Sequence, residues 1–208
     1  MSQARRIRRV YDHDPRRYHE GMSSPVTTWM LRGARGEVGE LVSGRLLDVG
    51  FGTGLSLPHY PDSVAVVGVD LSLPMLRHAG QAAGDRPAAL IQADAERLPF
   101  ADRSFDSVVF NLCLCTIPDP AAAVREAVRV ARPGAPMVFL EHVRSDILPV
   151  AILQDVINPA MVLWQADHFN RRTEQTVRRA GVEIVRSRRW LVGMFTLIVG
   201  RAPGAGRP

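Results

Sequence analysis

The chain has 208 residues, of which 46 % are hydrophobic, and carries a formal net charge of +5. This length is enough for one domain with an ordinary core, and the apolar runs are shorter than the ~18 residues that a transmembrane helix needs. Every basic residue is an arginine, which excludes chemistry that depends on a Schiff-base lysine or on the lysine of a Walker A loop.

The N-terminus and the cysteines indicate a cytoplasmic protein. Residues 1–15 include basic residues but no apolar segment behind them, so they do not resemble a secretory signal. Cys113 and Cys115 are too close for an easy disulfide and form no CxxC pattern, which fits a reducing compartment. We expect both cysteines to pack as small apolar side chains.

Arginines are concentrated in residues 5–17 and 171–189. Such clusters either meet an anionic partner (nucleic acid, a lipid surface or an acidic substrate) or form a solvated basic surface. Neither cluster is interleaved with aromatic residues or matches a nucleic-acid-binding motif. We therefore expect a solvated surface and no nucleic-acid partner, with weak contact to an anionic membrane surface, and so a peripheral membrane location, as the alternative.

Residues 1–43 are typical of a helical N-terminal segment, after which strands and helices alternate. Five apolar runs of strand length cover 45–50, 64–70, 88–92, 105–112 and 137–142. Near-continuous apolar strands separated by helices are typical of a parallel sheet that is covered on both faces.

Two of the intervening helices have clear start signals. Ser72 is placed to cap a helix with Pro74 in its first turn, and Asp119 is placed to cap another with Pro120 at its first position. Gly134 follows the second helix, as expected for a helix end.

The apolar segment Leu148–Trp164 is interrupted by Pro149 and Pro159. We predict that it packs on the core of its own domain; the alternatives are that it lines an apolar pocket or touches a membrane surface. The elements expected after it are a polar helix, two closing strands and a disordered tail, at 171–180, 182–188, 194–199 and 203–208.

A glycine-rich turn follows the first predicted strand, in LLDVGFGTG. Gly50, Gly52 and Gly54 let the backbone approach a ligand closely. The dinucleotide fingerprint GxGxxG needs glycine where the chain has Leu55, and the carboxylate of Asp48 would repel a pyrophosphate. The turn therefore favours a cationic ligand such as S-adenosylmethionine (SAM), whose ammonium group Asp48 would contact directly or through water.

Two further acids follow at the ends of the next two predicted strands. Asp70, in VVGVDLS, comes 22 residues after Asp48 and could accept hydrogen bonds from both ribose hydroxyls. Asp94, in QADAERLPF, could accept the adenine amino group while the backbone N–H of Ala95 faces the ring. Because ligands bind open α/β sheets at the carboxyl edge, we expect one site. A turn or capping role is the alternative for each acid alone.

As a set, LLDVGFGTG, VVGVDLS, QADAERLPF and SFDSVVFNLCLCTIPDP resemble the successive motifs of class I SAM-dependent methyltransferases, over about residues 44–142. The resemblance implies an α/β, Rossmann-like fold: a seven-stranded sheet of order 3-2-1-4-5-7-6, with strand 7 antiparallel and helices on both faces. It also implies a helical lid at 1–43, a SAM-binding domain at 44–202 and a substrate cover at about 145–170. The cofactor-binding residues expected from the motifs and the lid are Tyr11, Tyr18, Asp48, Gly50, Gly52, Thr53, Gly54, Asp70, Leu71, Met75, Asp94, Ala95, Asn111 and Leu112. For the two tyrosines, packing of the lid helix is the alternative.

The stretch from Asn111 to about Thr173 resembles the branch of membrane-associated alkyl-thiol methyltransferases and bacterial relatives named phosphatidylethanolamine or quinone methyltransferases. It departs from that branch at Ala135, where a second glycine is usual, and at Ala166-Asp167-His168, where Asp-Gly-Cys is usual. The methyl acceptor is therefore left open. The sequence does not indicate the oligomeric state.

The expected reaction is methyl transfer from SAM to a small, fairly apolar acceptor: a thiol, a phenol or quinone, or an amine. Since a sulfonium leaves as a neutral thioether, the protein must position the nucleophile and remove a proton where needed. The candidate bases are His142, Glu141 and His168, and a structural hydrogen bond is the alternative role for His142. A metal site formed by Glu141, His142, Asp167 and His168 is not expected, because the ligand spacing is loose.

Three other functions remain as alternatives. The first is phospholipid N-methylation at a membrane surface, and the second is a non-catalytic regulatory protein that binds SAM or a nucleotide on the same fold. The third, an NAD-dependent oxidoreductase, is disfavoured by Asp48 and Leu55.

Overall fold

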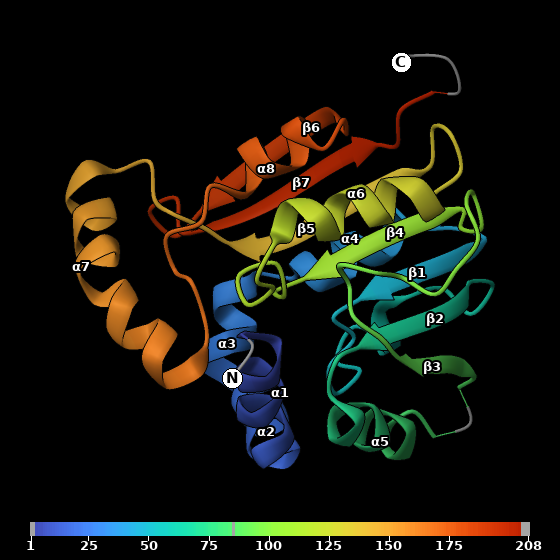
Figure 1. Ribbon diagram of the computed structural model, residues 1–208, viewed down its shortest axis with the longest axis horizontal. Helices are drawn as coiled ribbons and strands as arrows, with labels where there is room; N and C mark the ends of the chain where they lie inside the picture. The colour runs from blue at the N-terminus through green and yellow to red at the C-terminus, as the bar shows by residue number, and fades with distance from the viewer. Residues whose placement is uncertain (1–2, 85, 205–208) are drawn as a thin grey trace.

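The computed structural model describes residues 3–84 and 86–204, and these form a seven-stranded sheet of order β3-β2-β1-β4-β5-β7-β6 (Figure 1). Strand β7 pairs antiparallel with β5 and β6, and the other neighbouring strands are parallel. The predicted Rossmann-like α/β fold and strand order are confirmed.

The strands are β1 (Arg45–Val49), β2 (Ala65–Asp70), β3 (Ala88–Gln92), β4 (Ser107–Asn111), β5 (Pro136–His142), β6 (Glu183–Trp190) and β7 (Phe195–Arg201). The helices are α1 (Gln3–His13), α2 (Pro15–Met22), α3 (Pro25–Leu31), α4 (Ala34–Glu40), α5 (Leu73–Ala82), α6 (Pro120–Val130), α7 (Leu148–Gln165) and α8 (Thr173–Arg179), with a short 3-10 helix, η1 (Leu57–His59). Most of the predicted disordered tail, residues 205–208, lies outside the described residues.

Helices cover both faces of the sheet, which explains the near-continuous apolar strands. On one face α6 and α8 contribute Val124 and Val177 to a cluster with Phe110 of β4. On the other face α4 and α5 contribute Val38 and Leu76 to a second cluster. The central strands β1, β4 and β5 are therefore buried on both sides.

The two predicted helix starts are confirmed. The Ser72 hydroxyl accepts a hydrogen bond from the Met75 N–H at 3.3 Å, and the Asp119 carboxylate accepts one from the Ala122 N–H at 2.9 Å. Each cap satisfies a backbone donor that the first helical turn leaves unpaired.

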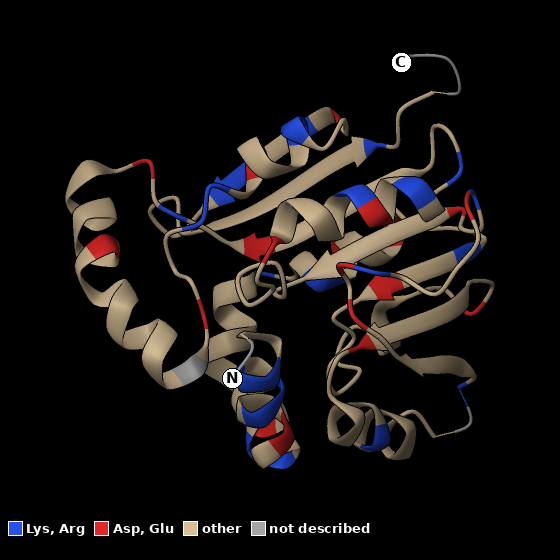
Figure 2. Cartoon of the chain, viewed as in Figure 1, with Lys and Arg blue, Asp and Glu red and all other residues tan. Residues whose placement is uncertain are grey.

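Helices α1 to α3 lie at the edge of the sheet where the parallel strands end (Figure 1). The first two contact α5, which follows β2. Basic residues run along α1 (Figure 2). The helical N-terminal segment therefore lies beside the edge at which a ligand is expected.

The predicted packing of residues 148–164 on the core is wrong. The segment is one uninterrupted helix, since Pro149 lies in the first turn, where its missing N–H is not needed, and Pro159 is accommodated inside the helix. It does not pack its apolar side chains on the core. Those that are exposed are Leu148, Ile152, Leu153, Val156, Ile157, Leu163 and Trp164. None of the described helices, this one included, is long and apolar enough to cross a membrane.

Candidate cofactor and acceptor site

The glycine turn after β1 has a backbone that only glycine adopts readily. Gly50 and Gly52 have φ values of 73° and 58°, in the left-handed region. A Cβ atom at Gly50 would overlap the Cys113 side chain, so no room remains for a larger residue. The turn therefore brings unhindered backbone to the carboxyl edge of the sheet.

Asp48 lies beneath this turn and is 1 % exposed. Its Oδ2 accepts a hydrogen bond from the Tyr60 hydroxyl at 2.7 Å, and its Oδ1 has no partner among the described residues. Burial raises the pKa of Asp48 to about 7, although the Tyr60 hydrogen bond opposes the shift. The Oδ1 of neighbouring Asn111 is also buried without a described partner. Both side chains line a small cavity with Thr53 and Tyr18. This cavity offers two unpartnered acceptors to a cationic donor.

Asp70 ends β2 and lines a second cavity. Its carboxylate accepts hydrogen bonds from the N–H groups of Gly52 and Ser72, both at 2.8 Å. Burial raises the pKa of Asp70, and these two hydrogen bonds oppose the rise. Each carboxylate oxygen keeps a lone pair for a hydroxyl donor.

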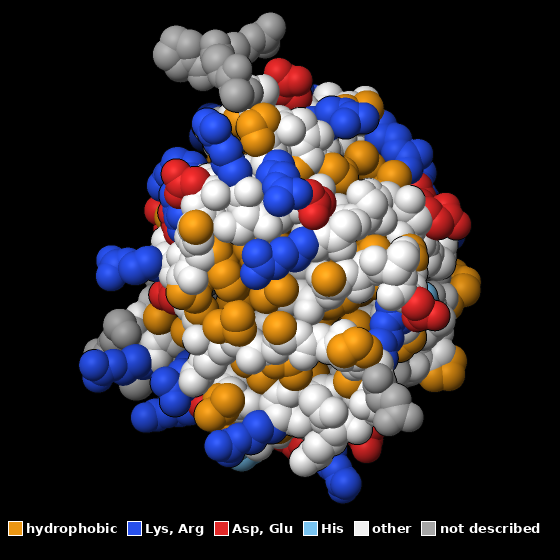
Figure 3. Space-filling model, turned by 90° about the vertical axis from the view of Figure 1, so that its right-hand side faces the viewer, with side chains coloured by type: hydrophobic (Ala, Val, Ile, Leu, Met, Phe, Trp, Pro, Cys, Tyr) orange, Lys and Arg blue, Asp and Glu red, His pale blue; other side chains and the backbone are white. Residues whose placement is uncertain are grey.

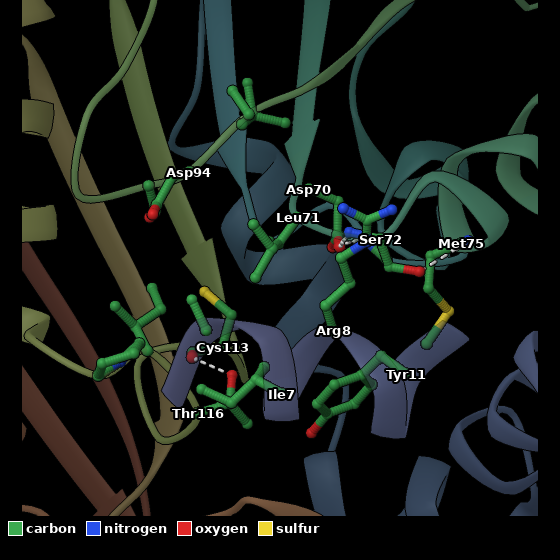
Figure 4. A pocket seen from close by; sticks show the side chains of 18 of the residues that line it. Ile7, Arg8, Tyr11, Asp70, Leu71, Ser72, Met75, Asp94, Cys113 and Thr116 are labelled. Carbon is green, nitrogen blue, oxygen red and sulfur yellow. Dashed lines mark hydrogen bonds between the residues drawn. The ribbon is translucent and has the colours of Figure 1, made fainter. Parts of the chain in front are cut away.

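The other residues expected around the adenosine part line the same second cavity: Leu71, Met75, Asp94 and Ala95 (Figure 4). Gly54 lines none of the three cavities described in this subsection and packs against Phe51 and Ala79.

Helix α1 covers the second cavity. Ile7, Arg8 and Tyr11 line it, and Arg8 reaches toward Asp70 and Ser72 (Figure 4). The helix is fastened by Asp12, whose Oδ1 accepts a hydrogen bond from the Ser72 hydroxyl at 2.6 Å. Sequence reasoning missed Ile7, Arg8 and Asp12, because their contacts join segments far apart in the chain.

Helix α2 contacts the glycine turn. His19 Nδ1 lies 3.0 Å from the Thr53 hydroxyl oxygen. The ring of Tyr18 meets that of Tyr11 edge to face at 5.8 Å. Burial raises the pKa of the Tyr18 phenol, so it stays protonated near neutrality.

A third cavity, of about 800 Å³, lies between the N-terminal helices and the end of α7. Its volume falls in the range of pockets for small molecules. The apolar and aromatic side chains that line it include Val10, Met22, Met30, Leu31, Trp164, Phe169 and Phe195. Tyr18 and Leu112 line all three cavities. The three cavities therefore meet beside the end of β4.

One titratable pair faces the third cavity. His142, at the end of β5, and Asp167, just after α7, both line it, and Nε2 of His142 lies 3.2 Å from Oδ2 of Asp167. Burial alone would lower the pKa of His142, but the hydrogen bond and charge of Asp167 outweigh burial and raise it. Nδ1 of His142 is buried without a described partner, and the ring stacks on Phe169 at 4.7 Å. With Nε2 as the donor to Asp167, Nδ1 keeps a lone pair that can take a proton.

The two other candidate bases lie elsewhere. Glu141 is fully buried and accepts hydrogen bonds from the N–H groups of Cys113 and Leu114, both at 3.0 Å. It therefore holds the turn after β4 and lines none of the three cavities. His168 also lines none of them, and its backbone N–H donates to the Cys115 carbonyl at 3.1 Å. The geometry favours His142 over both.

Both cysteines are buried, with free thiols. Burial raises the pKa of each thiol, which keeps it protonated and poorly reactive. Cys115 lies close enough to His142 and Asp167 for one ligand atom of each to fall within 4.8 Å of the others. This group differs from the one considered from the sequence, in which Cys115 had no part.

Residues 47–139 match the family model described as a methyltransferase domain. The phosphatidylethanolamine N-methyltransferase of Cereibacter sphaeroides is 41 % identical over 118 residues, covering 55 % of this chain and 58 % of that relative. The demethylmenaquinone methyltransferase of Roseiflexus sp. (strain RS-1) is 46 % identical over 105 residues, covering 49 % and 44 %. The chain thus spans about half the length of the curated relatives it matches.

Solved structures support the fold. A SAM-dependent methyltransferase of Thermotoga maritima, described as a possible histamine N-methyltransferase, superposes with a TM-score of 0.74 at 20 % identity, covering 94 % of this chain and 99 % of that one. A SAM-dependent methyltransferase of Mesorhizobium loti has a TM-score of 0.63 at 21 % identity, covering 82 % and 97 %. These neighbours confirm the fold, and the family model with the two curated relatives confirms the sequence resemblance to SAM-dependent methyltransferases.

Proposed function

Because residues 47–139 are a methyltransferase domain, we propose that the protein transfers a methyl group from SAM to a small apolar acceptor whose nucleophile carries a proton. A thiol and the hydroxyl of a phenol or quinol are the acceptor groups that fit best. SAM supplies a methyl group on a positively charged sulfur when it is bound. The residues described above would bind SAM, orient the acceptor and remove the proton of its nucleophile.

The carboxyl edge of the sheet supports the choice of cofactor. Asp48 and the Asn111 carbonyl oxygen are unpartnered acceptors for an ammonium group beside the glycine turn. Asp70, Asp94 and Ala95 line one cavity, and we assign Asp70 to the two ribose hydroxyls and Asp94 with Ala95 to the adenine ring. Acceptors without partners in a buried site are costly unless a ligand supplies the donors.

The meeting of the three cavities supports the transfer geometry. In this proposal the Asp48 cavity would hold the methionine end of SAM, and the Asp70 cavity would hold the adenosine end. Tyr18 and Leu112 line both of these cavities and also the third one. These two residues would therefore lie where the methyl donor meets an acceptor in the third cavity, which would orient the two reactants.

The proposal depends on one observation above all: the His142–Asp167 pair faces the acceptor cavity. Asp167 orients the His142 ring and stabilises its protonated form, while Nδ1 accepts the proton that the nucleophile loses. A positioned base of this kind contributes about 10²–10⁴-fold in rate. Phe169, which also lines this cavity, excludes water from the apolar part of the acceptor.

The test is transfer of labelled methyl from SAM to a panel of alkyl and aryl thiols, naphthols and quinols. We expect transfer to at least one thiol, phenol or quinol, and His142→Ala lowers kcat at least ~100-fold. Since Asp167 raises the pKa of His142, the acid limb of the pH–rate profile moves to lower pH in Asp167→Asn. Unchanged kcat in His142→Ala would remove the base assignment.

A phospholipid amine is the second candidate acceptor, favoured by the 41 % identity to a phosphatidylethanolamine N-methyltransferase. Phosphatidylethanolamine vesicles in the same assay decide between the two, because methylated lipid with no transfer to thiols or phenols selects this acceptor. If no acceptor in the panel is methylated but the protein still binds S-adenosylhomocysteine, the result selects a non-catalytic SAM-binding protein.

A further inference from the structure

Helix α7 exposes apolar side chains along most of its length. Four of the largest exposures in this helix are those of Leu148, Val156, Leu163 and Trp164, at 66 %, 71 %, 72 % and 72 %. Contiguous exposed apolar patches mark interaction sites on soluble proteins. This helix therefore presents a surface that needs a partner of its own.

The helix is held to the domain by polar contacts. Its Gln154 side chain accepts a hydrogen bond from the Ser145 N–H at 2.7 Å and donates to the carbonyls of Val143 and Phe169. At the other end, Arg6 donates to the carbonyls of Val162 and Leu163. These bonds fix the helix while its apolar side chains remain uncovered.

Arginines flank the exposed helix. The only acidic residue in α7, Asp155, is paired with Arg144 at 2.8 Å. A polar cavity of about 320 Å³ beside that pair is lined by arginines and a single acid, Glu174; the arginines are Arg144, Arg172, Arg178 and Arg189. Figure 2 shows basic residues on α1, near the other end of α7, and on the segment before α8. Apolar side chains between clusters of arginine complement an anionic lipid surface.

The opposite side of the molecule differs. Figure 3, which looks at the right-hand side of Figure 1, shows basic and acidic side chains interspersed among apolar ones. Helix α7 lies on the left in Figure 1, away from this face. The exposed helix and its arginines are thus confined to one end of the molecule.

The acceptor cavity opens at the same end. Trp164 is both strongly exposed on α7 and part of the cavity wall, beside Asp167 and Phe169. A protein partner seated on α7 would cover this opening. A fluid lipid surface would leave it accessible and would deliver an apolar acceptor to it.

We propose that α7 and the flanking arginines dock this protein on an anionic membrane surface, and that the acceptor passes from the lipid beside Trp164 into the cavity. The passage of the acceptor into the cavity rests on the proposed function, whereas docking on the membrane does not. The helix lies in the interface with its apolar side chains among the lipids, and the arginines contact lipid phosphates.

Co-sedimentation with vesicles, without cofactor, tests docking. The full chain is expected to pellet with vesicles containing about 30 % phosphatidylglycerol at low salt, at least tenfold more than with pure phosphatidylcholine, and less at 0.5 M salt, because the arginine contribution is screened. The double variant Leu153→Gln/Val156→Gln loses at least tenfold in vesicle affinity. The matched control is Val185→Gln, on β6, where the side chain is equally exposed, at 63 %.

Three results would overturn docking through α7: no pelleting with anionic vesicles, equal pelleting of the double variant and the wild type, or an equal loss in the Val185 control. If the wild type forms a dimer without lipid and the double variant is a monomer, the surface belongs to a second copy of this chain instead. Binding of S-adenosylhomocysteine by the double variant, measured without vesicles, reports on the cofactor site separately. Failure of docking and failure of the proposed function are thereby distinguished.

Discussion

Asp48 and Glu141 are both buried carboxyls at the ends of strands, yet their surroundings give them different tasks. Each has one oxygen without a partner among the described residues, but Asp48 lines a cavity, whereas Glu141 accepts hydrogen bonds from two backbone N–H groups and lines none of the three cavities. Burial raises the pKa of each to about 7. A cationic ligand can reach only Asp48. The titration of Asp48 therefore affects ligand affinity, whereas the titration of Glu141 affects the free energy of unfolding.

The pKa of Asp48 predicts that cofactor binding depends on pH. A cation beside Asp48 favours the ionised form, so binding displaces a proton from a group that titrates near pH 7. We expect SAM affinity to fall from pH 8 to pH 6, by at most about tenfold per pH unit. Because the amino group of SAM also titrates, the affinity ratio of wild type to Asp48→Asn is the quantity to measure by calorimetry. A ratio independent of pH would contradict the assignment.

Glu141 predicts a pH dependence of stability. Its folded pKa of about 7 lies above the ordinary 4.5, so its contribution is complete below pH 4.5 and is lost as the pH rises through 7. Glu141→Gln keeps the acceptor oxygen without the charge. Relative to wild type, the variant should gain roughly 2–3 kcal/mol in free energy of unfolding between pH 5 and pH 8. Urea unfolding at both pH values measures this, and a constant difference would refute the prediction.

At the scale of elements, the sequence predicts features that depend on neighbouring residues, but not contacts between residues far apart in the chain. The caps at Ser72 and Asp119 depend on neighbouring backbone, so the sequence alone predicted them. The packing of α7 was predicted wrongly because an apolar segment does not reveal what covers it. The contact of Asp12 with Ser72 joins residues 60 positions apart, and no local pattern announces it.

The Asp12–Ser72 hydrogen bond predicts that α1 acts as a cofactor-dependent lid. Since α1 contains four arginines, at positions 5, 6, 8 and 9, trypsin cuts it readily when it is open. S-adenosylhomocysteine should slow cleavage several-fold in the wild type, and Asp12→Ala should abolish that protection. The control is Asp62→Ala, whose side chain is fully exposed. Equal protection in the Asp12 variant would show that α1 is not fastened through this residue.

For the whole molecule, the alternation of strands and helices predicts a parallel sheet, and the motif resemblance implies its strand order. The position of the acids at one edge follows from the parallel strands, whose carboxyl ends share that edge. The acceptor cavity was not predictable, because α1, α2, α3, the end of α7 and Phe195 each contribute part of its wall. The pair His142–Asp167 is a similar case: His142 is a candidate base from the sequence, but only the fold brings Asp167 within 3.2 Å of it.

The most direct test of the central claim is titration of the protein with S-adenosylhomocysteine in a calorimeter. Binding with one site per chain is predicted for the wild type. A loss of at least tenfold in affinity is predicted for Asp70→Ala, since each hydrogen bond to a charged group contributes about 1.5–3 kcal/mol. No heat of binding by the wild type, with S-adenosylhomocysteine or with SAM, would contradict the claim that this site holds a methyl donor.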